Sequence, residues 1–250
     1  METRTSTEKG WRATLEVVGV ALDYGKAVRQ VGRNKYPEET VAKILDTALA
    51  LFCSKGYDAT TIQDIVDGLD GMTKGAIYHH FKSKEEIFDA AFERAMAPVA
   101  KRRRAAFERD DLTGAQKLKA LYAAESVVPQ AELWARIRPA ADPVKSERLL
   151  ALQYQGTFDE SVEQYLLPVI EEGIADGSIV CDCPREAAEA VSLLANLWLL
   201  PLFRPLEPKE QMLSRARCLA RMAAAVGLDL GDEVLETTAQ VWQTWARSGW

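Results

Sequence analysis

Apolar residues in this chain recur at intervals of three and four positions, the spacing of one buried face of an amphipathic helix. Beyond residue 111, no stretch alternates for long between apolar and polar positions, as a half-buried strand would. The pattern predicts helices over residues 37–55, 84–109, 113–128, 131–137, 146–176, 185–203, 209–226 and 232–248, with two shorter helices between residues 60 and 81. We therefore expect an all-α protein.

The first of these helices has a marked start and stop. Pro37 suits the first helical position, and Glu38 with Glu39 suits the positive end of the helix dipole. Gly56 supplies the C-terminal stop. The inward stripe consists of Val41, Ile44, Leu45, Ala48 and Phe52. With the two short helices that follow, this helix should form a compact three-helix head.

The two short helices flank a tight turn. Thr60, followed three positions later by Gln63, predicts a capping box at the start of the first one. Glycine within residues 68–72 tolerates the positive φ angles that a tight turn demands. Thr73 is the predicted N-cap of the second short helix, whose inward face includes Ile77. This arrangement is a helix-turn-helix pattern.

The second short helix has the features of a helix that enters a DNA major groove. Small residues at its start, Gly75 and Ala76, would let the backbone approach DNA closely. The side chains of Thr73, Lys74 and Tyr78 can bond phosphates or base edges. These residues therefore form the predicted reading surface.

A phosphate site is expected at the start of the next helix. Ser83 and Glu86 predict another capping box there, beside Lys82 and Lys84. Free backbone N–H groups and a lysine at a helix start suit a phosphate group. Farther along this helix, we interpret the basic run over residues 101–104 as a solvated face, with a DNA contact as the alternative.

Two segments carry a resemblance to a known family. Residues 56–65 have the sequence Gly-Tyr-Asp-Ala-Thr-Thr-Ile-Gln-Asp-Ile, and residues 73–86 have the sequence Thr-Lys-Gly-Ala-Ile-Tyr-His-His-Phe-Lys-Ser-Lys-Glu-Glu. Together they resemble the DNA-binding domain of TetR (tetracycline repressor) family transcriptional regulators, over about residues 36–92. The turn over residues 68–72 is one residue longer than the usual family pattern.

The resemblance implies an all-α chain with a helix-turn-helix head, followed by a helical bundle that binds a ligand and forms the dimer. It divides the chain into an N-terminal extension over residues 1–35, a DNA-binding domain over residues 36–84, and a ligand-binding and dimerisation domain over residues 85–250. A dimer would bind a pseudo-palindromic operator in double-stranded DNA, since two-fold symmetry requires matching half-sites. The expected DNA-binding residues are Thr61, Thr73, Lys74, Gly75, Ala76, Tyr78, His79, His80 and Lys84.

The overall charge of the chain counts mildly against a nucleic-acid partner. The formal net charge is -6 and the isoelectric point is near 5.2, whereas DNA-binding domains are often basic. The local balance differs, because residues 72–84 contain three lysines and both histidines of the chain, without Asp or Glu. A small basic face is sufficient when sequence recognition, and not bulk charge, is the task.

The second domain is expected to hold a small-molecule effector that is mostly apolar or aromatic. Helical bundles often place ligand sites between facing helices, and the family resemblance implies such a pocket. Aromatic residues and one methionine make up the expected lining: Phe92, Met96, Tyr122, Trp134, Tyr154, Phe158 and Trp198. The alternative is that this aromatic set is ordinary core.

A homodimer interface is expected near the C-terminal end of the bundle. The helix predicted over residues 185–203 is apolar nearly all round after residue 189, so it must be covered on every side. One side could face a second subunit, together with Met212, Leu219 and Met222 of the next helix. The segment 232–250, with three tryptophans, is interpreted as a cap on the bundle and alternatively as a partner surface.

The leading hypothesis is a dimeric, ligand-controlled transcriptional regulator that acts as a repressor. A regulator controlled by a protein partner is an alternative, and an α-helical enzyme is another. The only histidines, His79 and His80, are adjacent and therefore roughly 100° apart around a helix, which makes them a poor pair for one metal ion. No glycine-rich phosphate loop occurs. We therefore expect neither an enzyme nor a cofactor.

The cysteines and the hydropathy pattern favour a cytoplasmic protein. Cys53 and Cys218 are interpreted as buried apolar side chains. Cys181 and Cys183 are interpreted as loop thiols, with a metal or redox site as the alternative. The N-terminus lacks an unbroken apolar core typical of a signal peptide, and no apolar stretch is long enough to span a bilayer.

The first 35 residues precede the recognisable pattern. Trp11, Leu15, Val18 and Leu22 would fit a short amphipathic helix. The segment is basic overall, so one interpretation is an arm that reaches the minor groove. Because residues 31–39 fit the usual start of the family, we expect instead that residues 1–30 are untranslated or poorly ordered and dispensable for DNA binding.

Overall fold

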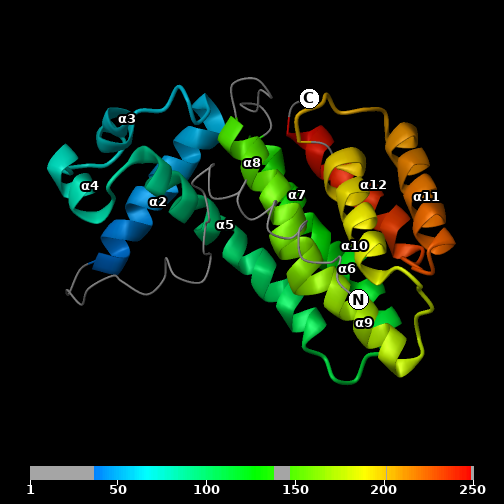
Figure 1. The fold of residues 1–250 in the computed structure, drawn as a ribbon. Coiled ribbons are helices and arrows are strands. Elements are labelled where there is room, and N and C mark those ends of the chain that lie inside the picture. The colour runs from blue at the N-terminus through cyan, green and yellow to red at the C-terminus, as the bar shows by residue number, and fades with distance from the viewer. Residues whose placement is uncertain (1–36, 138–146, 201, 249–250) are drawn as a thin grey trace, which may run out of the picture. The chain divides into compact units, whose positions relative to one another are not determined.

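The computed structural model describes residues 37–137, 147–200 and 202–248, and all regular secondary structure in these ranges is helical (Figure 1). This confirms the predicted all-α fold class. The elements in chain order are α2 (Pro37–Lys55), α3 (Ile62–Asp67), α4 (Lys74–His80), α5 (Lys84–Phe107), α6 (Gly114–Tyr122), α7 (Ala124–Ile137), α8 (Glu147–Gln155), η3 (Gly156–Leu166), α9 (Leu167–Asp176), α10 (Pro184–Leu193), η4 (Leu194–Leu199), α11 (Lys209–Ala225) and α12 (Glu233–Arg247). The expectations for residues 1–35 lie outside the described residues.

Helices α2, α3 and α4 share an apolar core with the first turns of α5. Ile44, Ile65, Ile77 and Ile87, one from each of these helices, are fully buried. In the predicted inward stripe of α2, every residue is buried except the half-buried Val41. No helix in the described ranges is both long and apolar enough to cross a membrane.

The N-cap of α3 is one residue later than predicted. The Thr61 hydroxyl accepts a hydrogen bond from the Asp64 N–H group at 3.1 Å, and the Asp64 carboxylate accepts one from the Thr61 N–H group at 2.7 Å. The prediction of a box between Thr60 and Gln63 was therefore wrong. Thr60 is fully buried, and its hydroxyl donates to the carbonyl of Gly56 at 2.7 Å instead.

The predicted capping box at the start of α5 is only half formed. The Ser83 hydroxyl accepts a hydrogen bond from the Glu86 N–H group at 3.2 Å, as predicted. The Glu86 carboxylate, however, accepts from the N–H group of Lys82 at 2.6 Å and not from that of Ser83. The helix still begins at Lys84, and it ends at Phe107, two residues before the predicted end.

The chain between residues 113 and 137 breaks at Ala123 and not at Pro129. Pro129 lies inside α7, whereas Ala123 is extended, with a ψ angle of 158°. The hydroxyl of Ser126 donates to the carbonyl of Ala120 at 2.8 Å across this break. The prediction of a helix end near Pro129 was wrong because this local bonding allows the chain to turn earlier.

A second apolar core lies among α6, η3, α9, α10 and α11, with Leu118, Val162, Ile170, Ala188 and Leu219 in its interior. Two helices in it approach each other closely. A Cβ atom at Gly114 of α6 would lie 2.2 Å from the backbone nitrogen of Gly173 in α9, so glycine is required there. Beside this contact, the ammonium group of Lys117 bonds Glu172 at 2.7 Å.

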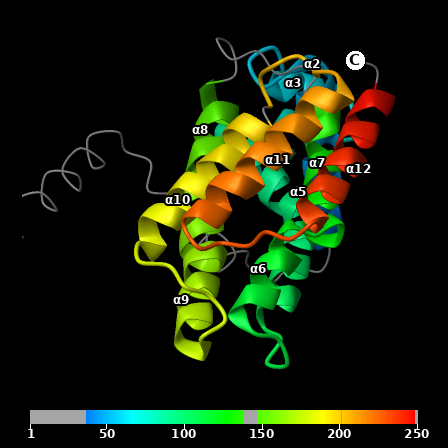
Figure 2. The same cartoon turned by 90° about the vertical axis from the view of Figure 1, so that its right-hand side faces the viewer.

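Helix α12 packs against α7 and α11, as expected of a segment that caps the bundle. Trp245 is buried, and its indole N–H group donates to the carbonyl of Ala131 at 2.9 Å. The indole N–H group of Trp242 donates to the carbonyl of Glu207, also at 2.9 Å. Figure 2 shows α10, α11 and α12 on one side of the bundle.

The cysteines agree only partly with the sequence interpretation. Cys53 is buried, as predicted, but Cys218 is exposed, so its assignment to a buried face was wrong. Cys181 and Cys183 are half-buried, and Cys183 is the N-cap of α10. Within the described ranges, no group of three or more His, Cys, Asp or Glu side chains could hold a metal ion.

Candidate functional site

The turn and the start of α4 form one side of the head. Gly71 has a φ angle of +72°, which the turn between α3 and α4 requires and glycine adopts without strain. The Thr73 hydroxyl accepts a hydrogen bond from the Ala76 N–H group at 3.2 Å, which confirms Thr73 as the N-cap. Ile77, one turn later, anchors α4 in the core. The rest of α4 is therefore free to face outward.

The outward residues of α4 have few partners within the protein. Lys74 is exposed and Tyr78 is 49% exposed, and neither side chain forms a hydrogen bond or ion pair within the described ranges. The exposed His79 and the half-buried His80 contact each other, with ring centroids 5.4 Å apart. Lys74 and Tyr78 therefore have polar groups that no described residue bonds, and these groups remain available to a ligand.

Gly75 has no structural reason, within its own chain, to be glycine. A Cβ atom there would meet only the Thr73 hydroxyl, at an ordinary contact distance of 3.9 Å. Glycine inside a helix is less favourable than alanine by about 0.8–1.0 kcal/mol. The small size of Gly75 therefore favours a close approach by something outside the chain.

Thr61 and Lys84, two of the expected DNA contacts, already have partners. The Thr61 hydroxyl also donates to the Asp64 carboxylate at 2.7 Å. The Lys84 ammonium group donates to the carbonyl of Tyr57 at 2.9 Å and lies 4.2 Å from the centre of the Tyr57 ring. Lys84 thus holds the segment that follows α2 against the start of α5, whatever else it contacts.

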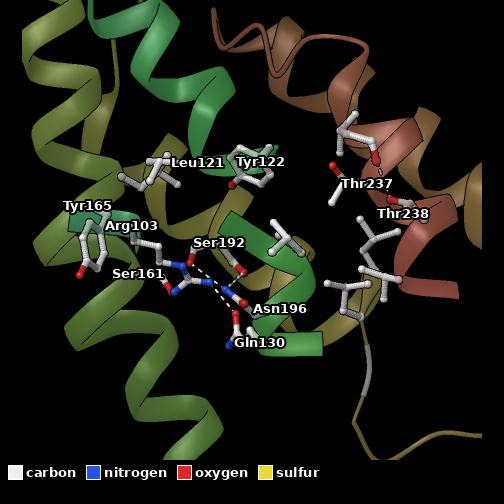
Figure 3. Close-up of a pocket in the computed structure, with 17 residues that line it drawn as sticks. Arg103, Leu121, Tyr122, Gln130, Ser161, Tyr165, Ser192, Asn196, Thr237 and Thr238 are labelled. Carbon is white, nitrogen blue, oxygen red and sulfur yellow. Dashed lines mark hydrogen bonds between the residues drawn. The ribbon is translucent and has the colours of Figure 1, made fainter. Parts of the chain in front are cut away.

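The second candidate site is a cavity of about 80 Å³ inside the bundle. A cavity needs roughly 10–15 Å³ for each water molecule, so this one has room for several waters or a small ligand. Its lining comes from helices far apart in the sequence: Arg103, Leu121, Tyr122, Val127, Gln130, Ser161, Tyr165, Leu166, Ser192, Ala195, Asn196, Leu199, Leu200, Val234, Thr237, Thr238 and Val241 (Figure 3).

One side of the cavity is polar and carries a positive charge. The Arg103 guanidinium group donates to the Gln130 side-chain oxygen at 2.5 Å, and Figure 3 shows it pointing toward Gln130 and Asn196. The Asn196 amide group donates to the carbonyl of Ser192 at 3.0 Å and to its hydroxyl at 3.2 Å. The lining contains no Asp or Glu, and Arg103 forms no ion pair within the described ranges.

The hydroxyl groups that line the cavity differ in their hydrogen bonding. Thr237 is only 4% exposed, and its hydroxyl has no hydrogen-bond partner within the described residues. In Figure 3 it lies on the side of the cavity away from Arg103. Burial raises the pKa of the Tyr122 hydroxyl, and nearby Arg103 opposes this shift, so the phenol stays protonated at neutral pH. By contrast, the Thr238 hydroxyl donates to the carbonyl of Val234 at 2.6 Å.

Stretches of π-helix shape two walls of this cavity. Ser161, Tyr165 and Leu166 come from η3, and Asn196 with Leu199 comes from η4. The wider turns of a π-helix change the direction of side chains relative to an α-helix, and such turns frequently occur at functional sites.

Of the seven residues predicted to line a ligand pocket, only Tyr122 lines this cavity. Phe92 and Trp134 are buried neighbours in the apolar core, with ring centroids 5.5 Å apart, and Met96 packs against the same core. Tyr154 is 55% exposed and contacts Phe158. Trp198 lies 5.6 Å from the Arg215 guanidinium carbon.

Sequence reasoning missed the polar members of the cavity. Lys101, Arg102 and Arg104 are exposed, as the interpretation of a solvated face predicts, but it was wrong for Arg103, which is half-buried and faces α7. One signal was present, because Ser192 and Asn196 stand four residues apart in an otherwise apolar run. No local signal marked Gln130 or Thr237.

The proposed dimer surface also needs correction. Met212 and Leu219, expected to face a second subunit, are buried at 2% and 0% exposure within their own chain. Met222 is 39% exposed, beside the exposed Cys218 on the same face of α11. On the neighbouring α10 and η4, Ala190 is exposed, and the half-buried Leu193 and Leu197 belong to neither apolar core of the described ranges. We call Ala190, Leu193, Leu197, Cys218 and Met222 the α10–α11 face.

Comparisons with known proteins agree with this geometry. Residues 44–91 match the family model described as bacterial regulatory proteins, tetR family. A segment of 47 residues is 49% identical to the HTH-type transcriptional repressor KstR2 of Mycobacterium tuberculosis, and it covers 19% of this chain and 23% of that repressor.

A second relative is the biofilm operon icaADBC HTH-type negative transcriptional regulator IcaR of Staphylococcus epidermidis, which is 43% identical over 51 residues. That match covers 20% of this chain and 27% of IcaR, so the chain matches only about a quarter of the length of these two relatives.

The fold extends farther than the sequence similarity. A bacterial regulatory protein of the tetR family from Rhodococcus RHA1 has a TM-score of 0.50 and 22% sequence identity to this chain. The similarity covers 77% of this chain and 99% of that one. At this level of identity, the similarity supports the fold alone.

Proposed function

The chain belongs to the bacterial tetR family of regulatory proteins, and we propose that it is a homodimeric transcriptional repressor that a small-molecule effector releases from its operator. The repressor role is supported by the two relatives whose names describe them as a repressor and a negative regulator. The match to the family model, over residues 44–91, contains α3 and α4.

The observation that carries the DNA-binding proposal is the outward face of α4. It combines a free lysine, a half-exposed tyrosine and a glycine that the fold itself does not require. In this proposal, Lys74 and Ala76 face base edges, and Tyr78 with the backbone near Gly75 contacts phosphates. Thr61, Thr73, His79, His80 and Lys84 complete the contact surface.

The effector would bind in the cavity around Arg103 and Thr237. This cavity is lined by residues of α5, α6, α7, η3, α10, η4 and α12, and α5 also carries Lys84 at the edge of the head. A ligand that favours one position of α5 would change the spacing of the two heads in a dimer. Such coupling is typically worth about 1–3 kcal/mol.

The dimer would form through the α10–α11 face. Its apolar residues are exposed or half-buried, and they lie on α10, on η4 that continues it, and on α11, which contacts both. A second copy would cover this face by two-fold symmetry, with the same residues contributed from both subunits.

One experiment tests the whole proposal. Duplexes bound by the purified protein are selected from a random-sequence library, and the mass of the free protein is measured by light scattering. We expect a dimer and an enriched inverted repeat, bound with an affinity that falls steeply with salt because phosphate contacts release counterions. A monomer that enriches no sequence would refute the proposal.

A further inference from the structure

The chemistry of the cavity indicates more than an apolar ligand. This inference rests on the proposed effector role of the cavity. We propose that the ligand is a small organic carboxylate, whose anionic group binds Arg103 and whose apolar body extends toward Thr237.

The charge of the lining selects for an anion. Arg103 is the only ionisable side chain in the lining apart from the tyrosines. Its hydrogen-bond acceptor among the described residues is the neutral side chain of Gln130. One bond to Gln130 leaves other guanidinium N–H groups for a carboxylate, which can accept two of them at once. The lining contains no Asp or Glu to repel an anion. Glu160 lies outside the lining, and its effect on the pKa of the Tyr165 hydroxyl is opposed by Arg103 and Arg104.

The same lining argues against a cationic ligand. A buried ammonium group would need a carboxylate or an aromatic cage, and the cavity supplies neither. It would also be placed near the guanidinium group of Arg103. A neutral apolar ligand would leave the charged donors of Arg103 unused, which costs binding energy once water is displaced.

The opposite side of the cavity suits the ligand body. Leu199, Val234 and Val241 provide apolar contacts there. The buried hydroxyl of Thr237 lies beside them and has no hydrogen-bond partner in the part of the chain that the structure describes. A buried polar group of this kind normally has a hydrogen-bond partner, so a second oxygen at the far end of the ligand would complete it.

The test is calorimetric titration of the full-length protein without DNA, using butanoate, hexanoate and octanoate. Hexanamide, which has the shape of hexanoate but no charge, is the control ligand. We expect hexanoate to bind at least about tenfold more tightly than hexanamide, because only the carboxylate forms charge-assisted hydrogen bonds with Arg103. This comparison needs no variant.

Two variants locate the site. Arg103→Gln should lower hexanoate affinity at least about tenfold and leave hexanamide affinity unchanged. Arg102→Gln, which removes the exposed neighbouring charge, is the control and should change neither. Thr237→Val should weaken binding of a hexanoate with a terminal hydroxyl more than binding of hexanoate itself.

The proposal is overturned if hexanamide binds as tightly as hexanoate, if Arg103→Gln leaves carboxylate binding intact, or if no carboxylate in the series binds. Because the titration contains no DNA, these outcomes leave the repressor proposal standing. Conversely, carboxylate binding that depends on Arg103, in a protein that selects no operator, would support the ligand class and refute the repressor proposal.

Discussion

Arg148 of α8 and Asp89 of α5 form a two-point ion pair that joins these helices. Arg148 Nε donates to one carboxylate oxygen of Asp89 at 3.1 Å, and Arg148 Nη2 donates to the other. Both side chains are about three-quarters buried, at 25% and 24% exposure. The pair fixes α5 shortly after it leaves the head, on the route by which a ligand would act on DNA binding.

Loss of this ion pair should destabilise the fold, and the effects of removing its two members should not be additive. We expect Asp89→Asn and Arg148→Gln each to lower the free energy of unfolding, and a double-mutant cycle to give a coupling energy of about 1–3 kcal/mol. The exposed Arg109–Asp111 pair, at 2.6 Å, is the control and should give a much smaller coupling energy, because solvent screens exposed charges. Equal coupling energies for the two pairs in urea denaturation would contradict this interpretation.

Gly75→Ala should raise the stability of the protein and lower its affinity for DNA. The added methyl group has space within the chain, so the variant should be more stable by up to about 1 kcal/mol, while a close contact with DNA should be lost. The control is Gly156→Ala in the bundle, where a Cβ atom would meet nothing within 4 Å. Fluorescence anisotropy with the selected duplex measures affinity, and unchanged affinity in Gly75→Ala would argue against close approach at α4.

Variants of α4 should distinguish residues that set base preference from residues that raise affinity for any DNA sequence. We expect Lys74→Ala to change base preference and Tyr78→Phe to weaken binding to all duplexes, each by about 1–3 kcal/mol. The comparison uses one operator and a set of single-base variants. If Tyr78→Phe shifts base preference and Lys74→Ala does not, the two roles are reversed.

Lys84 is not a clean probe of phosphate binding, because it also bonds the carbonyl of Tyr57. Lys84→Ala should therefore lower both stability and DNA affinity, and thermal denaturation should be measured beside binding.

Two adjacent threonines in α12 should respond in opposite ways without ligand. Thr237→Val removes a buried hydroxyl that has no partner among the described residues, so stability should stay equal or rise by up to about 1 kcal/mol. Thr238→Val removes a hydroxyl that donates to Val234, so stability should fall by about 0.5–1.5 kcal/mol. Urea midpoints measure both, and equal losses would show that Thr237 has a partner in solution.

Asp64 should stabilise the head in a manner that depends on pH. The ammonium group of Lys55, followed by the hydroxyl and N–H groups of Thr61, holds the pKa of Asp64 well below its usual range. A lowered folded-state pKa adds stability that is complete above the unfolded value of about 3.9 and is lost as the pH falls through the folded value. The stability difference between wild type and Asp64→Asn should therefore shrink as the pH is lowered from about 5 to about 3. A constant difference in thermal denaturation would contradict the assignment.

The head could be predicted closely because its signals are local. Thr73 caps α4 through a bond to the N–H group three residues later, and Gly71 makes the turn through its own φ angle. Both effects depend on neighbours in the chain, so they are visible in the sequence. The one-residue error at Thr60 arose from its buried bond to Gly56, because Thr60 and Thr61 are both acceptable caps by residue type.

The lining of the interior cavity could not be predicted from the sequence, because it depends on tertiary structure. Arg103, Gln130, Ser192 and Thr237 come from four helices, and the helices meet only when the whole bundle packs. Aromatic residues looked more probable as a lining by type, yet Trp134 and Phe92 fill the apolar core instead. The π-helical turns of η3 and η4 also shift side chains away from the faces that a regular helical period predicts.

The sequence by itself determined the all-α class, the helix-turn-helix and its outward residues, since helix periodicity, caps and turns act over a few residues. Only the tertiary structure decided that Met212 and Leu219 are internal, that Arg103 faces a cavity, and that Thr237 has no partner within residues 37–137, 147–200 and 202–248. The physical reason is that burial and hydrogen-bond satisfaction depend on which other helix covers each side chain, and the spacing of residues along one helix does not specify that neighbour.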